Sequence, residues 1–203
     1  VYDVADPFSN GLARVVLDGK YGFVDKTGNL VIPCVYDEAS NFSDGLACVK
    51  LYGKMGWIDE RDNHVIPCVY DAAEPFSDGL ACVGISDDIW ERKFGLIDKS
   101  GSHVVSCVYD AVEPFSDGMA RVEWDDKYGF IDKTGKRVIP CRYEFVTEFS
   151  EGLACIGIDG IEGWYRKYGF IDKAGNEVIS CKYQNASKFS DGLARVERNE
   201  KYG

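Results

Sequence analysis

The sequence lacks the features that mark membrane insertion. No run approaches the roughly 18 consecutive apolar residues that a transmembrane helix needs, and the N-terminus has no basic segment followed by an apolar one, as a signal peptide would. The chain opens at "VYDVADPF", without an initiator methionine and already inside a motif, as a mature or trimmed segment of a longer product would. We therefore expect no membrane insertion.

An excess of basic residues is also missing. The chain has 23 Lys plus Arg against 34 Asp plus Glu, and its net charge is -11. A field of this sign repels phosphate backbones and anionic lipid headgroups. Nucleic acid and membrane surfaces are therefore not expected as partners.

Catalytic motifs are absent as well. The two histidines, His64 and His103, stand at equivalent places beside turns, where exposure to solvent is the default. No G-x-S-x-G, H-E-x-x-H or phosphate-binding loop occurs. Because nothing assembles a nucleophile, a base and an oxyanion site, we expect no enzyme and no cofactor.

Apolar residues at helical spacing are missing too, and the chain instead repeats one motif six times. Each copy reads Y-D-x-A-x-x-F-S-D-G-L-A-[R/C]-V, a variable stretch, and K-Y-G-F-I-D-K-x-G-x-x-V-I-P-C; the sixth stops at "NEKYG". The copies lie 34 to 40 residues apart when aligned on their shared phenylalanine, which is Phe8, Phe42, Phe76, Phe115, Phe149 and Phe189. Such a period indicates a repeat architecture.

Within each copy the local patterns predict strands. "LARV", "YGFID" and "LVIP" are rich in β-branched and aromatic residues and are separated by Gly, Asp and Asn, as in β-hairpins. Gly28 suits the left-handed conformation of a tight turn, and Asp62 with Asn63 holds the same place in the second copy. We predict a three-stranded antiparallel meander followed by the connector Y-D-x-A-x-x-F.

Comparison of the copies predicts which side chains face inward. The residue after the Cys of V-I-P-C is variable, which indicates exposure; it is Val35, Val69, Val108, Arg142 or Lys182. Strand alternation then places the preceding Ile and Cys and the following Tyr on the buried face. The Tyr and Phe of the connector are expected to pack as apolar plugs between adjacent repeats.

The motifs "GFIDKTG" (129–135), "VIPCVYD" (31–37 and 65–71) and "FSDGLA" (42–47, 76–81 and 189–194) make the chain resemble the WG-repeat family of bacterial β-rich repeats over essentially all 203 residues. The Trp that names the family is kept in no copy; its place is held by Tyr21, Met55, Phe94, Tyr128, Tyr168 and Tyr202. An aromatic in five of six copies indicates a packing residue. The resemblance implies a repeat scaffold without an established enzymatic activity.

We predict an all-β single domain over 1–203, stacked as an open curved solenoid or superhelix. The alternative is a propeller-like closed ring, but the chain falls about one third of a repeat short of six, which favours the open array. The predicted repeats 1 to 6 cover, in order, 2–35, 36–69, 70–108, 109–142, 143–182 and 183–203.

The eight cysteines occupy two repeat positions: Cys34, Cys68, Cys107, Cys141 and Cys181 after the third strand, and Cys48, Cys82 and Cys155 in the first. Arg replaces the second set in the other repeats, which leaves no regular disulfide partner and favours small reduced thiols. Some disulfides stay open as an alternative, whereas metal is disfavoured because no C-x-x-C occurs. Reduced thiols favour a reducing bacterial cytoplasm over a secreted or surface location.

Two sets of repeated carboxylates flank turns. One precedes the second hairpin turn, at Asp25, Asp59, Asp98, Asp132 and Asp172, where an Asp side chain accepts backbone N–H bonds. The other is the Asp of F-S-D-G. Calcium is the functional alternative for both, but the ligand density of a calcium loop is missing, so we expect no metal.

Function is expected where the copies differ. Repeats 3 and 5 carry longer first hairpins, and repeat 4 adds "EWDDK". The candidate binding residues on these loops are Trp90, Arg92, Trp124, Trp164, Tyr165 and Arg166. Insertions in repeat arrays map to loops that often bind, and Trp, Tyr and Arg dominate binding hot spots. The structural alternative is that each Trp folds back over its own hairpin.

The sequence thus predicts a non-enzymatic scaffold that binds another macromolecule, a protein above all, through the first hairpins of repeats 3 to 5. A carbohydrate- or cell-wall-binding module is the second hypothesis, since periodic aromatics can stack on sugar rings. Against it, most of the aromatics recur at positions expected to be buried. An enzyme is the remote third.

Overall fold

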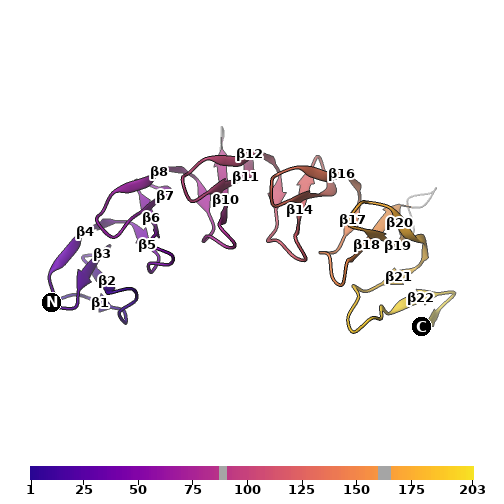
Figure 1. The fold of residues 1–203 in the computed structure, drawn as a ribbon, viewed down its shortest axis with the longest axis horizontal. Helices are drawn as coiled ribbons and strands as arrows, with labels where there is room; N and C mark the ends of the chain where they lie inside the picture. The colour runs from indigo at the N-terminus through magenta and orange to yellow at the C-terminus, as the bar shows by residue number, and fades with distance from the viewer. Residues whose placement is uncertain (87–90, 160–165) are drawn as a thin grey trace. The chain divides into compact units, whose positions relative to one another are not determined.

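The computed structural model describes residues 1–86, 91–159 and 166–203, and in these residues the chain is all β, without a helix (Figure 1). It divides into two compact units, an N-terminal unit of Val1–Cys107 and a C-terminal unit of Val108–Gly203. No sheet among the described residues closes into a barrel, and the tandem sheets are consistent with the predicted open array. The predicted repeat boundaries stay a sequence-based division.

Each repeat supplies one small sheet. In the N-terminal unit the sheets are β1 (Val4–Ala5), β2 (Leu12–Leu17), β3 (Lys20–Asp25) and β4 (Leu30–Tyr36); β5 (Glu38–Ala39), β6 (Ala47–Leu51), β7 (Lys54–Ile58) and β8 (His64–Tyr70); and β9 (Ala72–Ala73), β10 (Leu80–Ser86), β11 (Arg92–Asp98) and β12 (His103–Tyr109), whose end crosses into the next unit. In the C-terminal unit they are β13 (Ala111–Val112), β14 (Met119–Trp124), β15 (Lys127–Asp132) and β16 (Arg137–Tyr143); β17 (Phe145–Val146), β18 (Leu153–Asp159), β19 (Arg166–Asp172) and β20 (Glu177–Tyr183); and β21 (Asn185–Ala186), β22 (Val196–Arg198) and β23 (Lys201–Tyr202).

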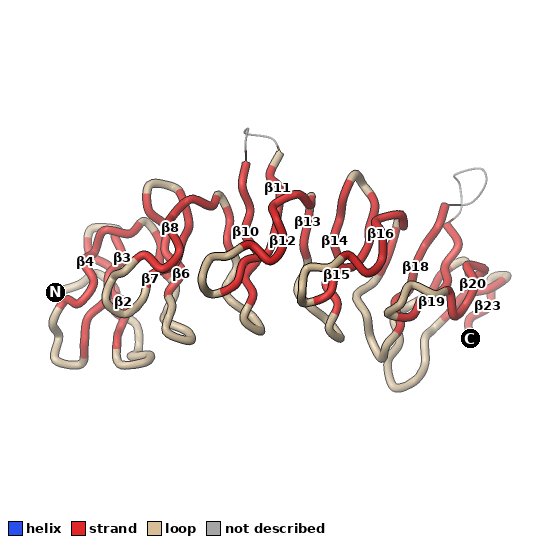
Figure 2. Tube along the Cα trace, turned by 45° about the horizontal axis from the view of Figure 1, so that its top comes forward, coloured by secondary structure: helices blue, strands red, loops and turns tan. Residues whose placement is uncertain are grey.

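The connector adds a strand that the sequence pattern does not predict. In repeats 1 to 5 the strands pair antiparallel in chain order, and the first of the four is a two-residue strand built from the connector (Figure 2). In repeat 2, for example, Glu38 pairs with Lys50 and Ala39 with Val49. Two residues are too short to show an alternating pattern, so the expected three-stranded meander is a four-stranded sheet.

The F-S-D-G motif forms the turn before the first long strand, as predicted. In repeat 2, Ser43 and Leu46 exchange both backbone hydrogen bonds, at 2.9 and 3.1 Å. Between them Asp44 and Gly45 have φ angles of 52° and 80°. Asp and Gly are the residues that adopt this left-handed pair most readily, so the motif is a two-residue hairpin turn.

Successive sheets within a unit pack face to face, and the connector phenylalanine lies between them. In the N-terminal unit one core cluster joins repeats 1 and 2, and its members are Phe23, Ile32, Tyr36, Ala39, Phe42, Ala47, Val49 and Ile58. The ring of Phe42 lies 4.8 Å from that of Phe23, edge to face. In the C-terminal unit the ring of Phe149 lies 4.6 Å from that of Phe130, and the two ring planes are tilted by 59°. The predicted apolar plug is confirmed.

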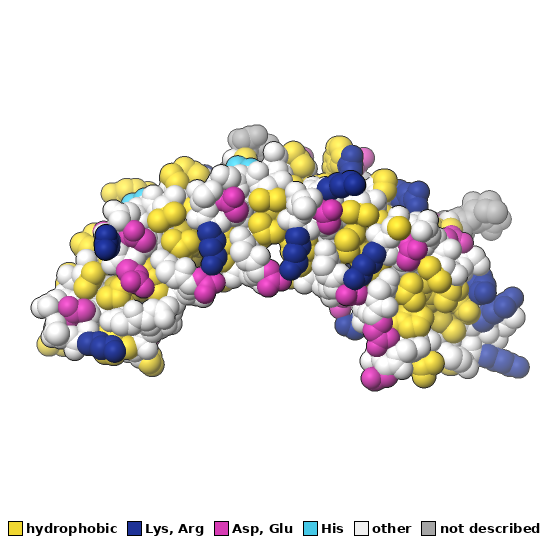
Figure 3. Space-filling view, viewed as in Figure 1, with side chains coloured by type: hydrophobic (Ala, Val, Ile, Leu, Met, Phe, Trp, Pro, Cys, Tyr) yellow, Lys and Arg dark blue, Asp and Glu magenta, His cyan; other side chains and the backbone are white. Residues whose placement is uncertain are grey.

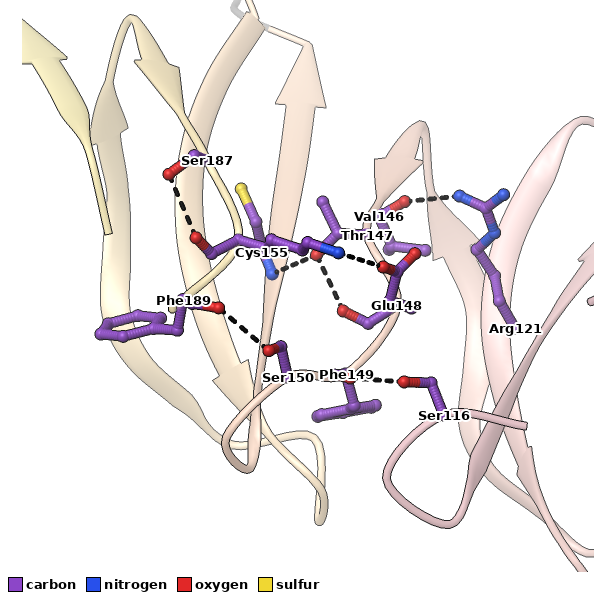
Figure 4. A network of polar contacts seen from close by, with 11 residues as sticks. Ser116, Arg121, Val146, Thr147, Glu148, Phe149, Ser150, Cys155, Ser187 and Phe189 are labelled. Atoms are coloured by element: carbon purple, nitrogen blue, oxygen red, sulfur yellow. Dashed lines mark hydrogen bonds and ion pairs between the residues drawn. The ribbon is translucent and has the colours of Figure 1, made fainter. Parts of the chain in front are cut away.

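Polar contacts accompany the plugs of the C-terminal unit (Figure 4). The Ser116 hydroxyl donates to the Phe149 carbonyl at 2.9 Å, and Ser150 donates to the Phe189 carbonyl of the next repeat at the same distance. Arg121 donates to the Val146 carbonyl at 2.8 Å. These bonds satisfy carbonyls that face the neighbouring repeat, where an unpaired polar group would cost free energy. They also fix the register of one repeat on the next.

The third strand follows the predicted alternation with one correction. Val35, Val69, Val108, Arg142 and Lys182 are exposed, as expected. The Cys, however, does not share a face with the Ile and the Tyr: Ile32 and Tyr36 belong to the cluster with repeat 2, whereas Cys34 packs on the opposite face. The reason is an irregularity in the pairing of β3 with β4, where Phe23 faces Ile32 and Tyr21 faces Tyr36. Four residue steps on β4, from Ile32 to Tyr36, therefore oppose two on β3, and the Cys side chain points to the opposite face of the sheet.

This bulge explains the glycine that follows the aromatic position in each of the first five copies. A Cβ added to Gly129 would lie 2.5 Å from the Ile139 carbonyl oxygen and 2.7 Å from the Cys141 nitrogen. The four equivalent glycines of repeats 1, 2, 3 and 5, which meet the same backbone at 2.4 to 2.8 Å, are Gly22, Gly56, Gly95 and Gly169. The bulged strand crosses so close that only glycine fits beneath it.

Gly129→Ala is therefore expected to lower the free energy of unfolding by about 1–3 kcal/mol or more, as overpacking against rigid backbone does. Urea unfolding followed by circular dichroism measures the loss. Val69→Ala, on the exposed face of β8, serves as the control and is expected to change stability by about 0.5 kcal/mol or less. Equal stability of Gly129→Ala and the parent chain would contradict the close approach.

Candidate partner-binding hairpins

The sequence predicts site residues on the first hairpin of repeats 3, 4 and 5. Trp90, Trp164 and Tyr165 fall outside the described residues. Arg92, Trp124 and Arg166 are described, so these three locate the hairpins in the fold.

Trp124 stands at the end of β14 and faces Lys127 across a two-residue turn. The turn residues Asp125 and Asp126 have φ angles of 53° and 56°, which Asp tolerates. The indole is 48% exposed, and the guanidinium of Arg137 lies over its ring at 5.2 Å from the centroid. Trp124 is therefore held in place by a cation–π contact while about half of its surface stays open to solvent.

Arg92 and Arg166 open β11 and β19, and each lies against a glycine of the paired strand. A Cβ added to Gly84 would meet the Cδ of Arg92 at 2.8 Å, and one added to Gly157 would meet that of Arg166 at 2.5 Å. The Arg166 guanidinium also forms an ion pair with Asp159 at 3.1 Å, and this hydrogen bond raises the pKa of Arg166. Both arginines thus brace the long hairpins and keep their charged ends at the surface.

Tyr52 is a candidate that sequence reasoning misses. It occupies the first position of the turn between β6 and β7, with a φ of 51°, and it is 91% exposed. The same turn position holds Asp18, Asp125 and Asn199 in repeats 1, 4 and 6. A comparison of the aligned hairpin tips could have found it, since a bulky residue replaces Asp or Asn at one place.

The histidines contact tyrosines of the preceding repeat. His64 Nε2 lies 3.3 Å from the Tyr36 hydroxyl, and His103 Nε2 lies 3.4 Å from that of Tyr70. Both imidazoles are exposed, as predicted. Burial, together with the hydrogen bond to Asp62 and its charge, raises the pKa of Tyr36. The contacts link neighbouring repeats, and the sequence gives no sign of them.

All eight cysteines are free thiols. Burial raises the pKa of Cys48 and of Cys155 to about 12, and that of Cys82 and of Cys181 to about 11. Because the thiolate is the nucleophile, these side chains stay protonated and unreactive near neutral pH.

The repeated carboxylates before the second hairpin turn accept backbone N–H bonds, as predicted. Asp132 Oδ1 accepts from Thr134 and Lys136 at 2.9 and 3.1 Å, and a third bond comes from the Thr134 hydroxyl at 2.6 Å. These bonds, led by that of the hydroxyl, hold the pKa of Asp132 below its usual value. Among the described residues no group of three or more His, Cys, Asp or Glu is placed to hold a metal ion.

Charges on the visible surface are mixed in sign, because Lys or Arg and Asp or Glu side chains alternate along each unit (Figure 3). Some are paired between repeats, as Lys99 is with Asp44 at 3.0 Å in the N-terminal unit and Lys173 is with Asp117 at 2.9 Å in the C-terminal unit. Within the residues that the structure describes, no helix is long and apolar enough to cross a membrane.

Two solved structures show distant likeness over nearly the whole chain. The crystal structure of puromycin hydrolase is 14% identical, with a TM-score of 0.38 and coverage of 95% of this chain and 41% of that one. The extracellular domain of the putative hybrid two component system BT3049 from B. thetaiotaomicron is 11% identical, with a TM-score of 0.33 and coverage of 93% and 35%. The chain thus spans less than half the length of either protein.

No curated protein matches the chain. The family model described as WG containing repeat matches it six times, over 1–21, 21–54, 55–87, 94–128, 128–160 and 168–202. These matches cover most of the sequence, and the close approach above Gly129 gives the glycine of the motif a physical basis. The chain therefore belongs to the family of WG containing repeats.

Proposed function

We propose that this chain is a non-enzymatic scaffold that binds a partner protein through the tips of its first hairpins. The observation that carries the proposal is Tyr52, a large aromatic side chain that is 91% exposed on a strained backbone. Trp124 supports it from the corresponding hairpin of repeat 4. Each tip belongs to a different compact unit.

The left-handed backbone conformation at Tyr52 costs free energy that packing of its ring does not offset. A left-handed conformation costs a residue with a side chain roughly 1–2 kcal/mol unless it is Gly, Asn or Asp. The equivalent Asp18, Asp125 and Asn199 avoid most of this cost. Because the Tyr52 ring is almost fully exposed, burial within the chain does not offset the strain. Strained residues of this kind cluster at functional sites, and tyrosine is a frequent hot-spot residue.

The non-enzymatic part of the proposal is supported by the chemistry of the described residues. The thiols with pKa values raised to about 11 or 12 are poor nucleophiles. The imidazoles of His64 and His103 contact tyrosine hydroxyls of the neighbouring repeat. The repeated Asp25 and Asp132 are engaged by backbone N–H groups of their own turns.

A protein partner is favoured over a carbohydrate by the burial of the repeated aromatics. Stacking on sugar rings needs exposed aromatic faces at regular intervals. The tyrosines that end the third strand of repeats 1 to 4 are buried; these are Tyr36, Tyr70, Tyr109 and Tyr143. One side of the exposed Trp124 ring is covered by Arg137.

Tyr52→Asn is expected to raise the free energy of unfolding by about 1 kcal/mol, because asparagine relieves the left-handed strain. Urea unfolding compares it with Asp18→Asn, which changes the same turn position between two tolerant residues and is expected to have little effect. A destabilised Tyr52→Asn variant would show that the ring supports the fold and would remove the main argument for a binding role.

Photo-crosslinking tests the partner directly. The amino acid p-benzoylphenylalanine is placed at position 52 or at position 124 of the protein expressed in its source cells, and position 18 serves as the matched hairpin-tip control. A discrete protein adduct is expected from positions 52 or 124 and not from position 18. Adducts of equal yield from all three positions, or from none, would contradict binding through these tips.

A further inference from the structure

One residue position at the contact between neighbouring repeats varies among the copies, and in repeat 2 a cavity lies beside it. In repeats 1 and 4 the third residue of the first long strand is an arginine that reaches the next repeat. Arg14 donates to the Ala39 carbonyl and pairs with Asp6 at 2.6 Å. Its guanidinium also lies over the Tyr21 ring, 5.4 Å from the centroid.

Repeat 4 builds the same arrangement with different residues. Arg121 donates to the Val146 carbonyl at 2.8 Å, pairs with Glu113 at 2.8 Å and lies 5.3 Å from the Tyr128 centroid. Two copies therefore show what this place in the fold accepts: a guanidinium bonded to a connector carbonyl and to a carboxylate, with a large side chain beneath it.

Repeat 2 has the place but not the arginine. Cys48 stands where Arg14 and Arg121 stand, and Met55 stands where the tyrosines do. An open cavity of about 230 Å³ lies beside Cys48 and Met55, and Ala73 and Pro75 of repeat 3 also line it. Pockets that hold whole small-molecule ligands are usually larger, at roughly 300–1,000 Å³, so this one suits a side chain.

Repeat 5 also carries a cysteine at this position, but with larger side chains around it. There the Cys155 thiol donates to the Ala186 carbonyl at 3.9 Å, and Phe145 packs on Tyr168 at 5.5 Å between ring centroids. In repeat 2 the Phe145 position is Glu38, which leaves the space open. Among the hydrogen bonds of the described residues, Cys48 makes none to the Ala73 carbonyl that corresponds to Ala186.

The chemistry around the cavity suits a cation. Glu38 lines it, and Glu74 lies in the chain between the lining residues Ala73 and Pro75. Burial raises the pKa of the Cys48 thiol, and the charges of Cys68, Glu38 and Glu74 add to this effect. Lys50 also lines the cavity, and it pairs with Glu38 at 2.9 Å.

We propose that the cavity beside Cys48 and Met55 binds an arginine side chain of a partner protein. The inserted guanidinium takes the place that Arg14 and Arg121 fill from within the chain, with the Ala73 carbonyl as acceptor. Ser40 stands where Asp6 and Glu113 do, so the counter-charge comes from Glu74 of the next connector instead. Arginine fits better than lysine because its planar fork donates to a carbonyl and a carboxylate together and is more weakly hydrated. The claim that a partner protein supplies the arginine rests on the proposed function, whereas the claim that the cavity binds an arginine side chain does not.

The two methionines of the chain make the test direct, because Met55 lines the cavity and Met119 is buried in the other unit. With ¹³C-methyl-methionine labelling, titration with Nα-acetyl-arginine amide is followed by NMR. A saturable shift of the Met55 methyl signal is expected, with no shift of Met119. Nα-acetyl-lysine amide, of the same charge, is expected to bind at least about fivefold more weakly.

Two variants locate the site. Cys48→Arg supplies the internal side chain of repeats 1 and 4, and it is expected to abolish the Met55 response while the Met119 signal shows that the protein is folded. Glu74→Gln, at an exposed position, is expected to weaken binding about fivefold without changing the fold, and it serves alone if Cys48→Arg unfolds.

An unchanged Met55 signal, equal binding of the lysine derivative, or a response that survives both substitutions would overturn the proposal. Because the probe is a small arginine derivative, these results do not depend on whether Tyr52 and Trp124 capture a partner. Failure of the arginine site and failure of the proposed function are therefore distinguishable.

Discussion

The packing of one connector phenylalanine on the preceding sheet is the interaction on which the rest of this structure depends. A sheet of four short strands is too small to hold a core of its own, so each repeat must bury an apolar face against a neighbour. Phe42 does so edge to face on Phe23, and Phe149 does so on Phe130 with tilted rings. The serine that follows the phenylalanine completes the joint by donating to the next connector, as Ser116 does.

The close approach of the bulged third strand is the second constraint, and it depends on the first. The bulge turns Cys34 toward one side of the sheet while Ile32 and Tyr36 face the other, so both faces become apolar. A two-faced sheet can pack on two neighbours, which a tandem array requires. Gly22, which has no Cβ to meet the bulge, makes this arrangement possible.

Much of the fold could be predicted from the sequence because six copies show which positions vary. The period, the hairpin turn at Asp44 and Gly45, and the burial of Phe42 all follow from that comparison and from turn chemistry. The fourth strand could not be predicted, because two residues carry no periodic pattern. The side on which Cys34 lies depends on a register shift between strands, which alternation along one strand does not encode.

The candidate sites were harder to predict, since they depend on the exposure of a side chain or on unfilled space beside it. Trp124 could be identified from its residue type and its place on a varied hairpin. Tyr52 differs from the Asp or Asn of the aligned hairpin tips, but its φ angle and exposure are what make it a strong candidate. The cavity beside Cys48 required the paths of Arg14 and Arg121 between repeats. In each case the scaffold position is shared by several copies, and one copy departs from what packing alone would select.

The most direct test of the central claim compares two phenylalanines at the same repeat position. Phe149 is 1% exposed between two repeats, whereas Phe8 is 51% exposed. Hydrogen exchange and urea unfolding of the two alanine variants measure what the joint contributes. We predict that Phe149→Ala lowers the free energy of unfolding by about 3–5 kcal/mol and speeds exchange in β16 and β18, whereas Phe8→Ala costs less than about 1 kcal/mol. Equal losses in the two variants would contradict the account.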